Sequence, residues 1–123
     1  MNKDQVVKEL VEVSEEKGLL PVLNTVWSRN IRVSVPFSQR ACDTNVDELE
    51  FSVRASNALK RAALFTVGDV IRTIENEELE RIRNLGRKTV NEIKTRLLVF
   101  GYERLTHTEK LQFWWKILEL RCE

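Results

Sequence analysis

Residues 52–101 read SVRASNALKRAALFTVGDVIRTIENEELERIRNLGRKTVNEIKTRLLVFG. Within this stretch LFTVG (64–68) and IRNLG (82–86) share one pattern of an aliphatic residue, any residue, a polar residue, an aliphatic residue and glycine. Each copy lies between two segments with helical periodicity. A glycine lets the backbone turn tightly with its amides exposed. The repeat therefore predicts two helix hairpins in tandem.

The helices around these turns are predicted from apolar spacing and capping residues. Ser52 is a good N-cap for a helix over 53–62, and Thr66 with Asp69 forms a capping box for a helix through Ile74. A short helix is expected at 77–82 and a longer one at 87–100, ending at Gly101. The predicted buried positions of this block are Val53, Ala55, Ala58, Leu59, Ala62, Ala63, Val67, Val70, Ile71, Leu79, Ile82, Leu85, Val90, Ile93 and Leu97.

The flanking segments are also predicted to be mainly helical. Residues 3–17 carry an apolar stripe that stops at Gly18, and Pro21 is expected to open a second helix through about residue 29. In residues 31–35 apolar and polar residues alternate, which predicts a short extended segment. Residues 37–46 are predicted to form an irregular connector. A capping box formed by Thr106 and Glu109 predicts a last helix through Leu120. The fold class is therefore all-α: a compact multi-helix domain with extra N- and C-terminal helices.

The last helix is apolar nearly all round. Trp114 and Trp115 stand among Leu111, Phe113 and Ile117, and such a helix must be covered. One interpretation is that the protein's own N-terminal helices and Trp27 cover it. The other is that Trp114 and Trp115 form a partner or dimer interface, where large aromatic side chains are favoured.

The composition excludes several classes of protein. A hydrophobic fraction of 42% with 32% charged residues is that of an ordinary globular protein, and neither a signal peptide nor a membrane span is predicted. Cys42 and Cys122 have no metal-ligand spacing, so free thiols in a reducing cytoplasm are expected. His107 is interpreted as a surface residue. No catalytic constellation, cofactor site or metal site is recognised, and we predict that the protein is not an enzyme.

The net charge of +1 conceals a sorting of charge along the sequence. Between positions 81 and 96, six basic residues stand against a single acid, Glu92, whereas acidic residues dominate just before. This pattern is compatible with one basic face on the folded domain. The alternative is an ordinary solvated helix face, which the charges alone favour.

Two segments carry a resemblance to a known family. VDELEFSVRASN (46–57) and NLGRKTVNEIK (84–94) resemble the C-terminal domain of the bacterial RNA polymerase α subunit, a helix-hairpin-helix module. The resemblance covers about half of the sequence, and the large assembly domain of an α subunit is absent from it. We therefore expect a module at 46–106, an N-terminal helical extension at 1–45 that packs on the core, and a C-terminal apolar helix at 107–123.

The resemblance implies binding to the minor groove of A+T-rich double-stranded DNA. Carried over residue by residue, Arg54 enters the groove and Asn57 lies one helical turn on. The second hairpin and its helix start meet the DNA backbone, with Glu92 nearby on the same helix. This part of the predicted DNA-binding set is Asn84, Gly86, Arg87, Lys88, Thr89 and Glu92. The sequence departs from the family at Ala58, where cysteine is common, and between the two turn glycines, where it is one residue longer.

Simple electrostatics supports the same interpretation without the family name. A helix N-terminus with free amides attracts anions, and an arginine suits a narrow A-tract minor groove. We therefore expect a cytoplasmic, DNA-binding or transcription-associated protein, and the rival interpretation is a protein-interaction adapter with a vestigial DNA face. Such an adapter would dock on RNA polymerase, a sigma factor or a transcription regulator, as the resemblance implies. A flanking helix covering Arg54, Asn57, Gly86 and Lys88 would favour the adapter.

Overall fold

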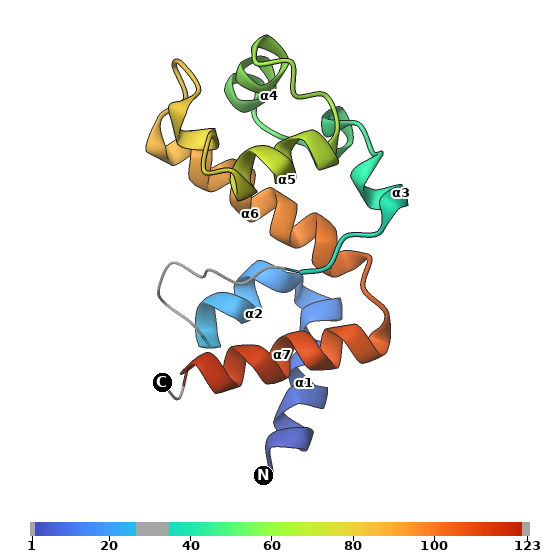
Figure 1. Cartoon of the computed structure of the whole chain (residues 1–123). Coiled ribbons are helices and arrows are strands. Elements are labelled where there is room, and N and C mark those ends of the chain that lie inside the picture. The colour runs from blue at the N-terminus through green and yellow to red at the C-terminus, as the bar shows by residue number, and fades with distance from the viewer. Residues whose placement is uncertain (1, 27–34, 122–123) are drawn as a thin grey trace. The chain divides into compact units, whose positions relative to one another are not determined.

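A computed structural model describes residues 2–26 and 35–121 of the protein (Figure 1). These residues form seven α-helices and two short 3-10 helices, and they contain no strand beyond one isolated antiparallel bridge between Asn45 and Thr66. The all-α prediction is confirmed. The elements are α1 (Lys3–Lys17), α2 (Leu19–Val26), α3 (Gln39–Cys42), η1 (Val46–Leu49), α4 (Val53–Arg61), α5 (Val67–Glu75), η2 (Leu79–Arg81), α6 (Arg87–Glu103) and α7 (His107–Arg121).

The protein divides into two compact units. Unit 1 combines residues 1–35 with 102–123, and unit 2 comprises residues 36–101. None of the helices in the described part of the sequence is long and apolar enough to cross a membrane.

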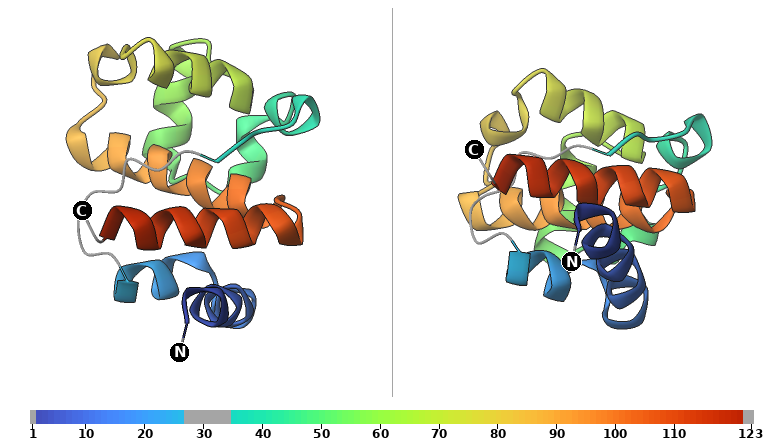
Figure 2. Two further views of the ribbon diagram at one scale, coloured as in Figure 1. Left: turned by 60° about the horizontal axis from the view of Figure 1, so that its bottom comes forward. Right: turned by 90° about the horizontal axis from the view of Figure 1, so that it is seen from below.

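Unit 1 is built on the pairing of α1 with α7, which lie side by side in Figure 2. Its centre is Tyr102, close to the end of α6. The Tyr102 hydroxyl accepts a hydrogen bond from Trp114 Nε1 at 2.8 Å and lies 3.0 Å from the buried hydroxyl oxygen of Ser14. The Trp114 side chain has no exposed surface. The protein's own residues therefore cover Trp114, which is unavailable as a partner contact, whereas Trp115 remains 37% exposed.

Burial raises the pKa of Tyr102 above its usual value, and the nearby carboxylate of Glu15 acts in the same direction. Hydrogen bonds with Ser14 and Trp114 oppose this shift. Removing a phenol from water disfavours its charged form more than these two hydrogen bonds favour it. Tyr102 is therefore held neutral inside unit 1.

Unit 2 encloses the core predicted for the two hairpins. The fully or nearly fully buried side chains are Ala41, Val46, Leu49, Ala55, Ala58, Leu59, Val67, Val70, Leu79, Leu85, Val90, Ile93, Leu97 and Phe100. Ile71 and Ile82 pack against this core and are partly buried. Two predicted core positions are wrong: Val53 is 78% exposed, and Ala63 is exposed with a left-handed backbone. Val53 is the first residue of α4, where the helix does not yet face the core.

The predicted caps at Gly18, Ser52, Thr66 and Thr106 are confirmed. Gly18 ends α1 with a φ of 91°, and the Ser52 hydroxyl oxygen accepts from the amide of Ala55 at 3.2 Å. Thr66 and Asp69 form the capping box of α5. Backbone amides donate hydrogen bonds to the Asp69 carboxylate, and the bond from Thr66 has the largest effect. These bonds hold the pKa of Asp69 below its usual value, because they favour the charged carboxylate. Thr106 and Glu109 exchange the equivalent pair of hydrogen bonds at the start of α7.

Several helix boundaries differ from the prediction. The second helix begins at Leu19, and Pro21 lies in its first turn, where a missing amide hydrogen has no cost. Residues 39–42 form α3, capped by Ser38, in a segment predicted to be irregular. The helix predicted at 77–82 shrinks to the single turn η2. The predicted contact of Trp27, the end of the second helix and most of the extended piece at 31–35 lie outside the described residues.

The turn glycines also differ from the prediction. Neither Gly68 nor Gly86 has a positive φ; the left-handed residues of the two turns are Ala63 and Asn84. Gly68 lies inside α5, where a Cβ would stand 3.2 Å from both Cβ and the carbonyl oxygen of Cys42. This glycine therefore allows α3 and α5 to approach closely. Gly101 does not end its helix, because α6 continues to Glu103.

Candidate nucleic-acid interface

The first part of the candidate site is the start of α4. Glu50 adopts a left-handed conformation just before it, and Ser52 caps the helix. The residues that follow divide cleanly between two faces. Arg54 and Asn57 are exposed, whereas Ala55, Ala58 and Leu59 are buried in unit 2. The predicted pair Arg54 and Asn57 therefore lies on the solvent side of the first two turns.

The second part is the turn into α6. Asn84 takes a left-handed conformation, and the carbonyl oxygen of Gly86 accepts the first helical hydrogen bond, from the amide of Val90 at 3.0 Å. A Cβ added at Gly86 would meet no atom within 4 Å, so the surface there is open. The backbone amides of residues 87–89 donate no hydrogen bond to another described residue. The start of α6 therefore presents free amides, which attract an anion.

Glu92 joins the two parts. Its carboxylate oxygens accept hydrogen bonds from the amide and from the hydroxyl of Ser52, both at 2.8 Å. Hydrogen bonds to an ionised carboxylate are stronger than those between neutral groups. The contact fixes the N-terminus of α4 against the second turn of α6, and so brings the helix start that carries Arg54 close to α6. Glu92 thus has a structural partner, which the sequence alone does not indicate because Ser52 lies 40 residues away.

The cations of this region are not all equally available. Lys94 Nζ lies 2.8 Å from a carboxylate oxygen of Glu80, and this hydrogen bond holds the pKa of Glu80 below its usual value. In contrast, Arg54, Arg87 and Lys88 are exposed and make no ion pair with another residue in the described part of the sequence. These three side chains are therefore available to an external anion.

Among the other predicted site residues, Asn84 and Gly86 are exposed at the turn. Thr89 is only 7% exposed, and it stands beside the core residue Val90. Its side chain is thus largely covered in unit 2, whereas its amide belongs to the open first turn of α6. Within the described ranges there is no cluster of three or more His, Cys, Asp or Glu side chains that could hold a metal ion.

Comparison with known proteins decides the family. The sequence profile of the C-terminal domain of the bacterial RNA polymerase alpha chain matches residues 36–98, which is half of this protein and nearly all of unit 2. The protein belongs to this family. The resemblance inferred from the two sequence segments is confirmed, and the family connects the protein with transcription and DNA binding at a general level.

The same family is represented among the curated relatives. The protein is 53% identical over 55 residues to the DNA-directed RNA polymerase subunit alpha of Syntrophomonas wolfei, covering 45% of this sequence and 17% of that protein. The subunit alpha of Thermotoga maritima is 50% identical over 59 residues, covering 47% and 17%. That of Aquifex aeolicus is 33% identical over 104 residues, covering 81% and 32%.

The protein thus spans less than a third of the length of these α subunits. No solved structure matches it significantly. The family match begins at Pro36, ten residues before the predicted start of the module at Val46. The boundaries at 45/46 and 106/107, and the packing of the flanks on the α-subunit-like domain, stay predictions.

Proposed function

We propose that this protein binds the minor groove of A+T-rich double-stranded DNA through the starts of α4 and α6. The observation that carries the proposal is the pair of hydrogen bonds between Ser52 and the Glu92 carboxylate, because they hold one exposed helix start against the other helix. Membership of the family of RNA polymerase α C-terminal domains supports the same function.

Each part of the site contributes a different interaction. Arg54 enters the minor groove, where the negative potential of a narrow A-tract favours a guanidinium, and Asn57 approaches the same groove one turn further on. The free amides at the start of α6 and the Lys88 ammonium contact phosphate, with Asn84 and Arg87 beside them. Gly86 leaves room for a phosphate to come close to the backbone. This arrangement distinguishes A·T from G·C and does not read a detailed base sequence.

Binding by a single copy of the protein should be weak. Few phosphates are neutralised, and a net charge of +1 gives little long-range attraction. We expect dissociation constants on the order of micromolar at low salt, with a steep loss of affinity as salt is added.

Arg54→Ala should remove most of the preference for A+T-rich DNA, because the groove contact is the part that senses groove width. The measurement is a fluorescence-anisotropy titration against A+T-rich and G+C-rich duplexes of equal length at two salt concentrations. Arg72→Ala is the matched control: it removes the same charge from an exposed α5 side chain that pairs with Asp69, and it should leave the preference intact.

Lys88→Ala should weaken binding to both duplexes alike, because a phosphate contact carries no sequence information. It should also reduce the slope of log affinity against log salt by about one unit. Absence of binding at low salt, or binding that Arg54→Ala does not change, would favour the rival function. In that case the protein is an adapter that docks on RNA polymerase, a sigma factor or a transcription regulator.

A further inference from the structure

A second arginine lies on the same face of α4 as Arg54. Arg61 is the last residue of this helix and follows Arg54 by seven positions, which is about 20° short of two full turns. Asn57 lies between them on the same face. All three residues are exposed. The helix face that carries the expected groove contact therefore continues for two turns to a second guanidinium.

The Arg61 side chain is directed back along α4 toward Arg54. Its Nε donates a hydrogen bond to the backbone carbonyl oxygen of Asn57 at 3.4 Å. Long side chains on helices lean toward the N-terminus, and this contact holds Arg61 in that direction. The hydrogen bond uses only Nε, so the two terminal amino groups of the guanidinium remain available to an external acceptor.

No acid compensates the charge of Arg61 within the described residues. The neighbouring cation, Lys60, pairs with Asp47 at 3.0 Å, whereas Arg61 makes no ion pair with any residue in the described ranges. The helix itself contains no acidic residue. Arg54 and Arg61 thus place two uncompensated positive charges on one helix face, which is the arrangement that attracts a polyanion.

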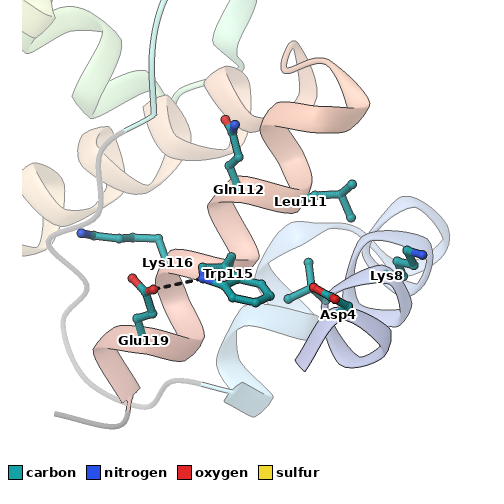
Figure 3. Close-up of a pocket in the computed structure, with 8 residues that line it drawn as sticks. Asp4, Lys8, Leu111, Gln112, Trp115, Lys116 and Glu119 are labelled. Atoms are coloured by element: carbon teal, nitrogen blue, oxygen red, sulfur yellow. Dashed lines mark hydrogen bonds between the residues drawn. The ribbon is translucent and has the colours of Figure 1, made fainter. Parts of the chain in front are cut away.

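The groove between α1 and α7 in unit 1 does not have this property. The charged residues that line it around Trp115 are Asp4 and Lys8 of α1 with Lys116 and Glu119 of α7 (Figure 3). The two acids offset the two lysines, so this groove offers little attraction to a polyanion.

The dimensions of DNA decide what Arg61 can meet. An α-helix with its side chains is about 10–12 Å across, whereas the minor groove is about 6 Å wide. The helix α4 therefore cannot enter the groove, and only side chains reach into it. When Arg54 reaches in from the first turn, a side chain two turns further on the same face meets the edge of the groove. Phosphates line that edge.

We propose that Arg61 contacts a phosphate at the edge of the minor groove that Arg54 enters. The inference rests on the proposed DNA binding and adds a second anchor on α4 to the phosphate contacts at the start of α6. A phosphate contact carries no information about base sequence. Arg61 therefore contributes affinity and salt dependence, whereas Arg54 contributes the preference for A+T-rich DNA.

The test is the anisotropy titration with A+T-rich and G+C-rich duplexes, at several salt concentrations between roughly 20 and 80 mM. Arg61→Ala should weaken binding to both duplexes alike and reduce the slope of log affinity against log salt by about one unit. The advantage of the wild type over this variant should therefore shrink about three- to fourfold across that range.

Two further variants serve as controls. Lys60→Ala removes a positive charge from the neighbouring position, but this lysine already pairs with Asp47, so the slope should change much less. Arg61→Lys retains the charge and should keep the slope of the wild type, because an ammonium also binds phosphate.

A purely structural role of Arg61 gives a different result. A cation in the last turn of a helix also stabilises that helix, and its loss would then lower the melting temperature and leave the salt slope unchanged. An unchanged slope overturns the proposal, and so does a loss of the A+T preference, which would place Arg61 inside the groove. If only Arg54→Ala has its expected effect, the proposed function stands without this contact. Absence of DNA binding by the wild type at low salt overturns both.

Discussion

Gly68 and Gly86 occupy equivalent places in the repeated turn pattern, but their surroundings differ. A Cβ at Gly68 would press on Cys42, whereas one at Gly86 would meet open space, and neither glycine has a positive φ. Gly68→Ala should lower the free energy of unfolding by about 1–3 kcal/mol, because the packed neighbour must move. Gly86→Ala should leave it unchanged or raise it by about 0.4–1 kcal/mol, because alanine restricts the unfolded state.

Urea unfolding followed by circular dichroism measures both effects. Gly86→Ala serves as the control for Gly68→Ala, since the same atom group is added in the same motif. Equal losses of stability in the two variants would contradict the difference in packing.

For single residues, the sequence predicts which positions are special better than it predicts the physical cause. The pattern that marks Gly68 as special is real, but a turn is the wrong explanation for it. The physical cause is the approach of α3, which no local pattern reveals, since Cys42 is distant in sequence. Likewise Arg54 and Lys88 are correctly expected to be exposed, whereas the burial of Thr89 follows from core packing around Val90.

Among the elements, α4 depends on α6 for the position of its first turn. Glu92→Ala removes both hydrogen bonds to Ser52 and should cost about 1 kcal/mol of stability, since the contact is partly exposed. If DNA binding depends on this placement, affinity for DNA should fall even though a negative charge has been removed. Electrostatics alone predicts the opposite, because removing a negative charge should raise the affinity for DNA.

Glu80→Ala is the matched control for this prediction. It removes the acid that pairs with Lys94 of the same helix but leaves Ser52 and α4 untouched. DNA binding of this variant should be unchanged or stronger. Equal effects of Glu92→Ala and Glu80→Ala on the anisotropy titration would show that Glu92 contributes only its charge.

Most helices are predictable from the sequence because their caps and apolar stripes are local. The differences arise where tertiary packing decides. α3 is a single turn, too short to produce a periodicity, and η2 is shorter than the helix expected there. Glycine in a helix interior costs about 1 kcal/mol, yet α6 continues through Gly101 because Phe100 and Tyr102 on either side of it are both buried. The link between Ser52 and Glu92 likewise joins residues that no local pattern connects.

For the whole molecule, alkaline pH should affect unit 1 first. Tyr102 is the only tyrosine, and burial raises its pKa in the folded state above the unfolded value of about 10. Its contribution to stability is therefore fully present below pH 10, and it is lost as the pH rises through the folded pKa. Unit 1 should unfold with the appearance of tyrosinate absorbance, while unit 2, which has no tyrosine, keeps its helices.

Tyr102→Phe is the control, because it removes the titrating group and retains the ring. Its unfolding should lose this component of the pH dependence. Tyrosinate that forms at an ordinary pKa with all helices intact would contradict the buried position of Tyr102.

Unit 1 takes its helices from both sides of unit 2 along the sequence, and this order has a consequence during translation. α1 and α2 leave the ribosome about 80 residues before α7 begins. At about 5–20 residues per second, they wait roughly 4–16 s with Val7, Val11 and Leu23 uncovered. Residues 36–101 are complete within that interval and can fold first. The nascent polypeptide therefore carries a finished unit 2 beside an unfinished helix pair, and that pair is where a chaperone would be needed.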